Sequence, residues 1–402
     1  MNHCMIVHSY YPYDETRVQR QAEALVEHGH TVDLIGLRNG NEPKRVCIDG
    51  VNVYRMPVQR DKARGLVGQL FEYFAFVCLA FIQVTRLHLR RRYDLVQVHN
   101  LPDFLVFAAL IPRLTGSRII LDLHDLMPEF YCAKFNTSMS NFMVRLVTLQ
   151  EKFACRFAHQ VITVTESWRQ TLIGRGVPAS KCSVVMNLAD PRYFNQTNTF
   201  KPIPTNELRL IYHGTVTRRY GLDLLLHALV RVREKNLPVH LTVQGRGDFL
   251  TENRALIHSL GLESSVSIHD EFLSAADLAQ LIRSNHVGVV PYRRDIFTDG
   301  ILPTKLLEYM ALGLAVIAAR TPAITAYCDE HTVELFTPED VEDLAQRILY
   351  LQEHPERCQE LAHNTSQFNQ RYNWTSERGR YVNLVEKLGR AHLAWQSNVA
   401  VK

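Results

Sequence analysis

Apolar runs of strand length alternate with segments of helical periodicity along most of the chain. CMIVHSY at 4–10, RIILDLHD at 118–125 and LRLIYHGT at 208–215 are typical of buried strands, and an amphipathic segment follows each of them. Strands that alternate with helices predict parallel sheets. The alternation stops in the polar, proline-containing stretch 195–207 and then restarts. The pattern therefore predicts two α/β domains that are joined there.

The length of the chain agrees with this division. It has 402 residues, enough for two domains that each bury a core. We expect two doubly wound, Rossmann-like domains at 1–195 and 196–375, and a closing helix at 376–402. Ligands of such sheets bind beyond the carboxyl ends of the strands. Two such domains that face each other would enclose a deep cleft, and functional side chains are expected at the strand ends.

Composition and charge narrow the class of protein. The formal net charge is +4 and no basic stripe is interleaved with aromatic residues, so nothing favours a nucleic-acid partner. The eight cysteines are scattered without a CxxC pair, which favours neither a zinc site nor a disulfide framework. No basic leader precedes the first apolar run, so we expect no signal peptide. These features favour a cytoplasmic protein without a bound metal.

One apolar segment raises the question of a membrane. LFEYFAFVCLAFIQV at 70–84 is interrupted by two polar residues, and four arginines follow it. We expect no segment to reach the length of a transmembrane helix. Two interpretations stay open for Leu70–Arg92. It is either a buried helix of an α/β layer with a solvated basic end, or a peripheral contact with the inner face of the cell membrane.

The segment GILPTKLLEYMALGLAVIAA at 300–319 is the most informative part of the chain. It predicts a loop, a short helix that ends at Gly313, and a buried strand. A helix N-terminus at the carboxyl edge of a parallel sheet is suited to anions. Lys305 lies in the first turn, where the helix dipole disfavours a cation unless a phosphate is bound. Glu308 could accept both hydroxyls of a ribose. The alternative is an ordinary amphipathic helix with both side chains solvated.

Polar side chains also follow strands in the first half of the chain. RIILDLHD ends at a histidine, His124, that could bind a sugar hydroxyl, act as a base, or be a core residue. DLVQVHN delivers His99, which could contact substrate or serve the structure. The loop YYPYDETR carries Tyr11, Tyr13 and Arg17, and its aromatic rings are suited to stacking on a sugar or an acceptor. The candidates for the acceptor side are Tyr11, Tyr13, Arg17 and His99.

The second half offers a comparable set. LRLIYHGT ends in Gly214 and Thr215, and VTRRYG follows before an apolar helix. Arg218 and Arg219 could clamp a pyrophosphate with charge-assisted bonds, or they could simply be solvated. VHLTVQGRGD brings Gly245 to another strand end, where the backbone could approach a nucleotide; a lone GxG is a weak signal.

In their order along the chain these segments resemble the GT-B glycosyltransferases of family 4. The resemblance covers nearly the whole chain and rests on RVQRQAEALVEHGHTVDLI, YDLVQVHNLPD, LDLHDLMPE, VVMNLAD, GTVTRRYGLDLLL and PTKLLEYMALGLAVIA. It implies an N-terminal acceptor domain, a C-terminal nucleotide-sugar domain, and a last helix that crosses back to the N-domain. It also implies a hexosyltransferase-type enzyme that transfers sugar with retention from a UDP or GDP donor, usually without a metal. The acceptor would be a glycan or lipid-linked.

The resemblance assigns roles to the donor-side residues. Glu308 would bind the donor ribose, as the second glutamate of the family's E-x7-E motif. Lys305 and the loop before it, which contains Ile301 and Leu302, would lie near the diphosphate. Arg219, with Arg218 as a substitute, would neutralise the leaving phosphate, and His124 would contact the donor sugar.

Two positions depart from the family pattern. The first glutamate of the motif is replaced by Gly300, and the adjacent Asp299 could substitute for it. Tyr220 stands where relatives carry a lysine after the phosphate-loop arginine. The expected function is a retaining transfer in cell-surface polysaccharide or glycolipid synthesis. The alternatives are a sugar-nucleotide epimerase of the same fold and a non-catalytic sugar-nucleotide-binding subunit.

Overall fold

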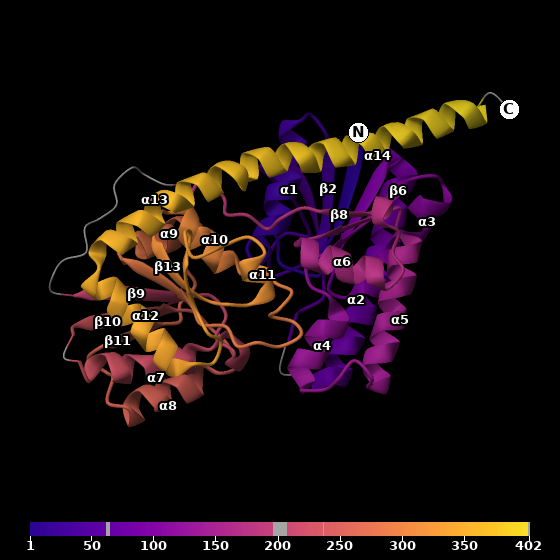
Figure 1. Cartoon of the computed structure of the whole chain (residues 1–402). Helices are drawn as coiled ribbons and strands as arrows, with labels where there is room; N and C mark the ends of the chain where they lie inside the picture. The colour runs from indigo at the N-terminus through magenta and orange to yellow at the C-terminus, as the bar shows by residue number, and fades with distance from the viewer. Residues whose placement is uncertain (62–64, 196–206, 236, 401–402) are drawn as a thin grey trace. The chain divides into compact units, whose positions relative to one another are not determined.

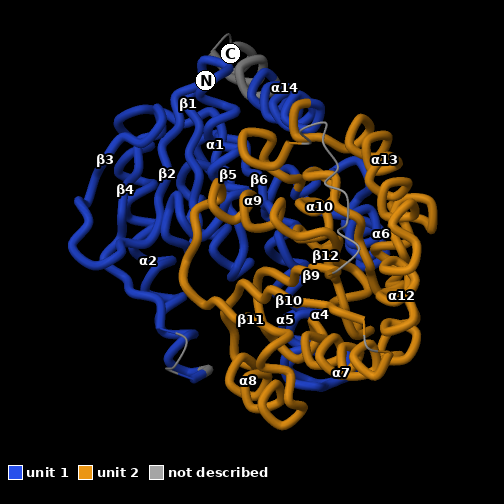
Figure 2. Tube along the Cα trace, turned by 90° about the vertical axis from the view of Figure 1, so that its left-hand side faces the viewer, with its two compact units in different colours: residues 1–187, 376–402 blue, residues 188–375 orange. Residues whose placement is uncertain are grey.

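The computed structural model forms two compact units. It describes residues 1–61, 65–195, 207–235 and 237–400 (Figure 1). The first unit comprises Met1–Asn187 with Ser376–Lys402, and the second comprises Leu188–Thr375 (Figure 2). The contacts thus assign residues 188–195 to the second unit, whereas the composition had suggested a boundary at 195. Residues 196–206 of the expected linker lie outside the described residues.

The first unit is built on one eight-stranded sheet with the order β3-β4-β2-β1-β5-β6-β7-β8. Its strands are β1 (Asn2–Ile6), β2 (Thr31–Leu37), β3 (Arg45–Ile48), β4 (Val51–Met56), β5 (Leu95–His99), β6 (Arg118–Leu123), β7 (Gln160–Thr163) and β8 (Cys182–Val184). All neighbours pair in parallel except β3, which forms an antiparallel edge with β4. The sequence pattern did not predict β3, because its side chains alternate between exposed and half-buried and leave no apolar run.

The helices of this unit cover the sheet. They are α1 (Thr16–Glu27), α2 (Gly65–Arg91), the 3₁₀ helix η2 (Asp103–Ala109), α3 (Leu110–Leu114), α4 (Met127–Phe135), α5 (Phe142–Phe157), α6 (Glu166–Gly174), the 3₁₀ turn η3 (Ala179–Lys181) and α14 (Trp374–Ala400). The segment Leu70–Arg92, for which a helix of an α/β layer was one interpretation, is helical as part of α2 up to Arg91. A 3₁₀ helix and a short α-helix follow β5.

The closing helix α14 packs on the first unit, as the family resemblance implied. The Tyr381 hydroxyl donates to Gln97 Oε1 of β5 at 2.7 Å, and both side chains are fully buried. The Glu377 carboxylate accepts from the backbone N–H of Met186 at 2.7 Å. These bonds join a segment near the end of the chain to strands near its beginning, so α14 is part of the core of this unit.

Helix α2 has an unusual outer face. Phe76 and Ala80 are fully buried, as expected for a helix of an α/β layer. Phe71 and Phe74, however, are 75% and 63% exposed. By length and composition Val67–Arg91 could cross a membrane. Only 22% of its most apolar 18-residue stretch is buried. The expectation that no segment reaches that length is therefore wrong, because the outer face is apolar as well as the inner one.

The second unit contains a six-stranded parallel sheet with the order β11-β10-β9-β12-β13-β14. Its strands are β9 (Leu208–His213), β10 (Val239–Gln244), β11 (Val266–His269), β12 (Val287–Val290), β13 (Ala315–Ala319) and β14 (Glu334–Phe336). Its helices are the 3₁₀ turn η4 (Arg218–Tyr220), α7 (Leu222–Arg233), α8 (Leu250–Ser259), α9 (Ala275–Arg283), α10 (Thr304–Ala311), α11 (Pro322–Thr325), α12 (Val341–Glu353) and α13 (Pro355–Arg371). Helix α10 begins and ends where the sequence predicted.

The topology places a crevice at the carboxyl end of β9. The chain proceeds from β9 to β10 and β11 on one side, then crosses to β12 on the other. Such a reversal of strand order opens a crevice beyond the strand ends. Gly288 of β12 leaves room for the ring of Tyr309, since a Cβ there would come within 2.3 Å of it. The Tyr309 hydroxyl bonds the backbone of Ile211 and His213, which fixes α10 beside this crevice.

Replacing Tyr381 by phenylalanine tests the docking of α14. The Tyr381→Phe change leaves the buried Gln97 amide oxygen without its donor, so we expect the free energy of unfolding to fall by about 1–3 kcal/mol. Urea unfolding of the whole chain measures it. Arg390→Gln changes an exposed residue of the same helix and should cost less than about 0.5 kcal/mol. Equal effects of the two substitutions would contradict the packing described for α14.

Candidate active site

Lys305 is the central cation of the second unit. It lies in the first turn of α10, is 4% exposed, and its Nζ has no hydrogen-bond partner among the described residues. Aromatic rings surround the ammonium instead. Its Nζ lies 3.8 Å from the ring centroid of Tyr212, 5.5 Å from that of Tyr220 and 5.6 Å from that of Tyr292. A buried cation that contacts only ring faces lacks a counter-ion, which an anionic ligand would supply.

Burial is also reflected in the titration of this side chain. Desolvation lowers the pKa of Lys305 to about 7, although the Glu308 carboxylate favours the charged form. Lys305 Cε lies 3.6 Å from where a Cβ on Gly214 would stand, and Gly214 has a positive φ of 96°. A larger residue at Gly214 would therefore crowd the lysine. The interpretation of Lys305 as a solvated surface residue is wrong.

Glu308 is joined to the end of β9. Its Oε2 lies 3.1 Å from His213 Nε2, and the Glu308 side chain is 20% exposed. The His213 ring packs edge-on against Tyr309 at a centroid distance of 5.0 Å. The carboxylate is thus oriented by a buried histidine and still reaches the surface of the crevice. Its expected role toward a ribose diol stays a prediction, and the interpretation as a fully solvated carboxylate is not supported.

Arg293 fixes the backbone of Arg218 and Arg219, the two arginines that were expected to bind phosphate. Arg293 forms a bidentate pair with Asp223 at 2.7–2.8 Å and donates to the backbone oxygen of Arg218 at 2.6 Å. Its own N–H donates to the backbone oxygen of Arg219 at 2.9 Å. The Arg219 guanidinium lies over the ring of Phe297. The turn is therefore fixed from the loop after β12, a role that the sequence gave no reason to assign to Arg293.

The remaining expected donor residues line the same edge. Gly214 and Thr215 are exposed, and an added Cβ on Gly245 would lie 1.9 Å from the oxygen of Gly214, so these loops touch through their backbones. Asp299, the expected substitute for a glutamate, pairs with Arg294 at 2.6 Å. That pair must open before the carboxylate can bind a sugar. In the adjoining loop Gly300 and Leu302 are buried, whereas Ile301 is half-buried.

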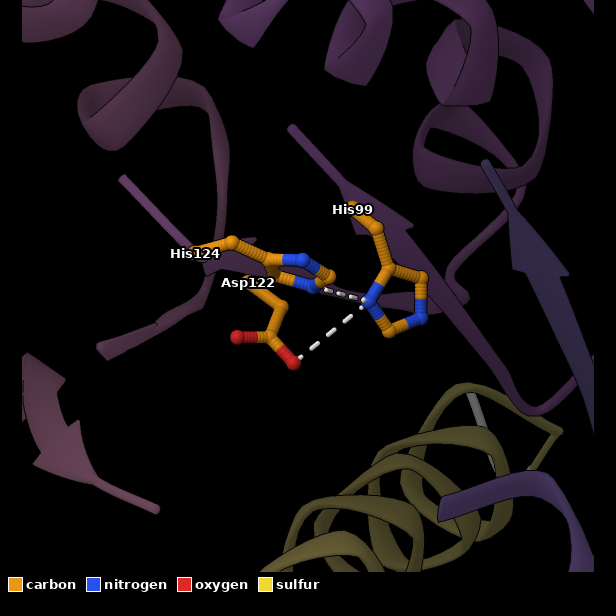
Figure 3. Close-up of side chains that lie close together, drawn as sticks. All are labelled: His99, Asp122 and His124. Carbon is orange, nitrogen blue, oxygen red and sulfur yellow. Dashed lines mark hydrogen bonds and ion pairs between the residues drawn. The ribbon is translucent and has the colours of Figure 1, made fainter. Parts of the chain in front are cut away.

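A network of buried charges lies at the corresponding edge of the first unit. Asp122 of β6 accepts from Arg17, at 2.9 Å between Nη2 and Oδ1, and from Gln21 at 3.0 Å. His99 Nδ1 lies 3.5 Å from Asp122 Oδ2 and 3.0 Å from His124 Nε2 (Figure 3). Burial would raise the pKa of Asp122, but the Arg17 guanidinium holds it well below its usual range. The sequence pattern hid Asp122, because it stands inside an apolar strand.

The same three side chains have the composition of a metal site. His99, Asp122 and His124 each offer a ligand atom, and these atoms lie within 4.8 Å of one another. The carboxylate, however, already carries a bidentate bond to Arg17, and the two imidazoles bond each other. A metal ion would have to displace a buried guanidinium. The network is therefore better described as an ion pair that positions two histidines.

His124 is held from both sides. Its Nε2 bonds His99, and its Nδ1 lies 3.4 Å from Glu15 Oε2, at the residue before α1. Burial lowers the pKa of His124, but the bond to Glu15 and the charges of Glu15 and Asp122 outweigh it, so the pKa is raised. The pKa of Glu15 is lowered despite burial by the same partner. The ring of His124 can form a hydrogen bond to a sugar only if the Glu15 side chain moves away from it.

The expected acceptor-side residues separate into two groups. Tyr11, Arg17 and His99 are buried, and Arg17 is bonded to Asp122 and the backbone of Val185. These three have no surface for an acceptor in this structure, so their expected role is replaced by a structural one. Tyr13 is 56% exposed, and its role on the acceptor side stays a prediction.

Two parallel α/β sheets and a long closing helix have the architecture of a GT-B glycosyltransferase. Two family models match the chain, a glycosyl transferase 4-like domain over residues 15–187 and glycosyl transferases group 1 over residues 207–354. The chain therefore belongs to the GT4-like, group 1 glycosyltransferases. It is a nucleotide-sugar-dependent enzyme, which confirms the class that the motifs indicated.

Known proteins of this family are distant from the chain. Chitobiosyldiphosphodolichol beta-mannosyltransferase of Debaryomyces hansenii is 22% identical over 81% of this chain and 73% of that protein. The amylovoran biosynthesis glycosyltransferase AmsK of Erwinia amylovora is 24% identical over 48% of this chain and 47% of its own length, so only about half of AmsK is matched. The structure of Anabaena Alr3699/HepE in complex with UDP-glucose has a TM-score of 0.72 and 17% identity over 96% of this chain and 100% of that chain. This likeness confirms the expected fold.

Replacing Lys305 by methionine should separate stability from binding. The folded-state pKa of about 7 lies below the ordinary lysine value of 10.5, so the unfolded chain binds more protons between these values and stability rises with pH there. Lys305→Met removes this penalty, and we expect a gain of about 1–3 kcal/mol near neutral pH together with a loss of nucleotide binding. Urea unfolding and thermal shifts with UDP and GDP measure both.

Lys235→Met, at an exposed lysine of the same unit, serves as the control and should change neither quantity. A Lys305→Met protein that is less stable, or that binds nucleotide as before, would contradict the assignment. In the unchanged enzyme, nucleotide affinity should fall as the pH rises through about 7, because the ammonium loses its charge.

Glu15→Gln should lower the pKa of His124. The raised folded-state pKa means that ionised His124 stabilises the fold below its unfolded value of 6.5, and the contribution is lost as pH rises through the folded value. We expect a lower titration midpoint for His124 and a stability loss of about 0.5–1 kcal/mol, discounted for the partial exposure of Glu15. NMR of labelled histidines reports the midpoint. Glu27→Gln, on the same helix, should leave it unchanged.

Proposed function

We propose that this glycosyltransferase moves a sugar, with retention, from a UDP or GDP donor to a glycan or lipid-linked acceptor in cell-surface polysaccharide or glycolipid synthesis. The donor half of this proposal is supported by the buried ammonium of Lys305, which meets aromatic faces and has no hydrogen bond or ion pair among the described residues. A diphosphate at the N-terminus of α10 would neutralise this charge and interact favourably with the helix dipole. Glu308, one turn further along, would accept the ribose hydroxyls.

The proposed mechanism follows from where charge develops. As the bond between the anomeric carbon and the phosphate oxygen breaks, the leaving nucleoside diphosphate gains negative charge. Fixed cations and backbone amides aimed at that charge lower the barrier. Lys305, Arg219 and the N-terminus of α10 would supply them. The acceptor hydroxyl would attack the same face, form the new bond to carbon and pass its proton to the departing phosphate.

The relatives support the acceptor class without identifying it. The Debaryomyces hansenii relative is named for mannosyl transfer to chitobiosyldiphosphodolichol, which is a lipid-linked saccharide. AmsK is named for amylovoran biosynthesis. Both involve cell-surface or lipid-linked glycans. An acceptor carried by a lipid would be met at a membrane surface, and the apolar outer face of α2, with its basic end, is suited to such a contact. We therefore extend the proposal to a cytoplasmic enzyme that binds the inner face of the cell membrane through Leu70–Arg92.

Glu308→Ala tests the donor site. Removing the carboxylate deletes the acceptor for the ribose diol, so we expect the affinity for the cognate nucleotide sugar to fall by about tenfold to a hundredfold. Thermal shifts with UDP-, GDP- and ADP-sugars identify the donor first and then compare the variant. Glu252→Ala, at an exposed glutamate of α8, is the matched control. Unchanged donor affinity in Glu308→Ala would remove the basis of the site, and epimerisation of the donor without any acceptor would favour an epimerase.

A further inference from the structure

A second apolar surface lies on the first unit, on helices that neighbour α2. We call it the α5 surface. It consists of exposed side chains of η2, α3 and α5, namely Phe107, Leu110, Leu114, Phe142, Met143, Leu146, Leu149 and Phe153. Helices at the surface of a soluble domain normally turn polar residues outward. An exposed apolar patch of this extent marks an interaction site.

The α5 surface carries a shallow, open groove. A groove of about 500 Å³ runs between η2, α3 and α5, with Leu146, Leu149 and Phe153 along one wall. Phe107 lies on the other side, edge-on to Phe157 at 5.2 Å. Arg113 closes one end, with its guanidinium 4.8 Å from the centre of the Phe157 ring. The groove is therefore apolar along its length and cationic at its end.

A basic pocket adjoins the groove and shares Arg156 with it. Lys152, Arg156 and Lys181 line this pocket of about 340 Å³ together with Arg175. Lys181 Nζ donates to the backbone oxygen of Arg156 at 3.2 Å, which holds two of these cations close together. Burial lowers the pKa of Lys181, and the guanidiniums of Arg113 and Arg156 lower it further. The cations repel one another, and a bound anion would relieve that repulsion.

Within the part of the chain that the structure describes, carboxylates neutralise Arg175, which pairs with Glu129 and Glu151, but not the other cations of this cluster. The carboxylates of α5 and η2 are Glu151 and Asp103, and both are buried. Glu151 is paired with Arg175, at 2.9 Å. Arg113, Lys152 and Arg156 have no ion-pair partner among the described residues. The helices thus keep their acidic groups inside and present cations around the apolar groove.

The α5 surface is continuous with the proposed contact of α2. The 3₁₀ helix η2 packs against β5 and β6, and also against both α2 and α5. Phe107 and Leu110, at the end of η2 and the start of α3, therefore lie between the two helices. An apolar plane bordered by cations is the arrangement that binds an anionic bilayer, with side chains among the acyl chains and cations at the headgroups.

We propose that the α5 surface is a second membrane contact, in which the groove receives acyl chains and the adjoining basic pocket receives the phosphate of an anionic phospholipid. A second copy of the chain is a poorer occupant. A two-fold interface places the same patch on both partners, so it would bring two sets of unpaired cations together. Lipid contact does not depend on the donor chemistry; only delivery of a lipid-linked acceptor to this unit rests on the proposed function.

Vesicle flotation of the full chain tests the proposal without any sugar donor. Wild-type protein is mixed with phosphatidylcholine vesicles, with or without phosphatidylglycerol. We expect binding that requires phosphatidylglycerol and weakens with salt. The pair Leu149→Gln and Phe153→Gln should lower the partition coefficient by roughly tenfold or more. The pair Lys152→Gln and Arg156→Gln should lower binding to the anionic vesicles by a comparable factor.

The controls separate lipid binding from other causes. Phe272→Gln replaces a 69% exposed aromatic of the second unit and should not change vesicle binding. Circular dichroism melting verifies that each variant folds. Binding of the Leu149→Gln and Phe153→Gln protein at the wild-type level would overturn the proposal, as would a wild type that ignores anionic vesicles. So would a change of the α5 variant from dimer to monomer in sedimentation without any effect on vesicles, since it would indicate a second copy as the occupant.

Discussion

Parallel pairing on both sides of β9 is the constraint on which the donor chemistry depends. Because β10 and β12 flank this strand, the loops that leave β9 and β12 meet beyond its carboxyl end, and α10 is held there by the bonds of Tyr309 to the backbone of β9. The Lys305 side chain lies there among tyrosine rings. The sheet therefore fixes a positive charge in a place where solvent cannot neutralise it, and a phosphate becomes the natural complement.

The charged side chains at the strand ends are paired with one another in the first unit, whereas Lys305 in the second unit forms no ion pair among the described residues. In the first unit, Arg17, Asp122, His99, His124 and Glu15 neutralise one another through a continuous set of contacts. That edge is electrostatically complete before any ligand arrives, and it is suited to positioning a neutral hydroxyl. In the second unit, Lys305 has no such partner among the described residues. The incomplete edge is suited to a charged donor, and the cost of burying the lysine is the kind of strain that functional sites retain.

Much of the fold could be predicted from the sequence because its signals are local. Alternating strands and helices, the proline before α10 and the glycine after it each act within a few residues. The set of tyrosine rings around Lys305 could not be predicted, because Tyr212, Tyr220 and Tyr292 come from three separate segments of the chain. The position of a polar residue at the end of a strand also did not show whether its side chain is free to bind a ligand or is already bonded to another side chain. Arg17 and His99 follow the expected pattern, yet both are committed to a carboxylate inside β6.

Helices α2 and α5 show why the average composition of a chain does not reveal an exposed apolar surface. A net charge of +4 and ordinary hydrophobic content describe an unremarkable protein. On α2 and α5, however, Glu72 and Glu151 are buried, whereas most of the arginines and lysines lie outside, beside exposed phenylalanines. This segregation is a property of helix faces, so it disappears when charges are summed along the chain. A helix that is apolar on both faces is stable in water only where something covers the outer one. The cations around these faces indicate that the cover is negatively charged.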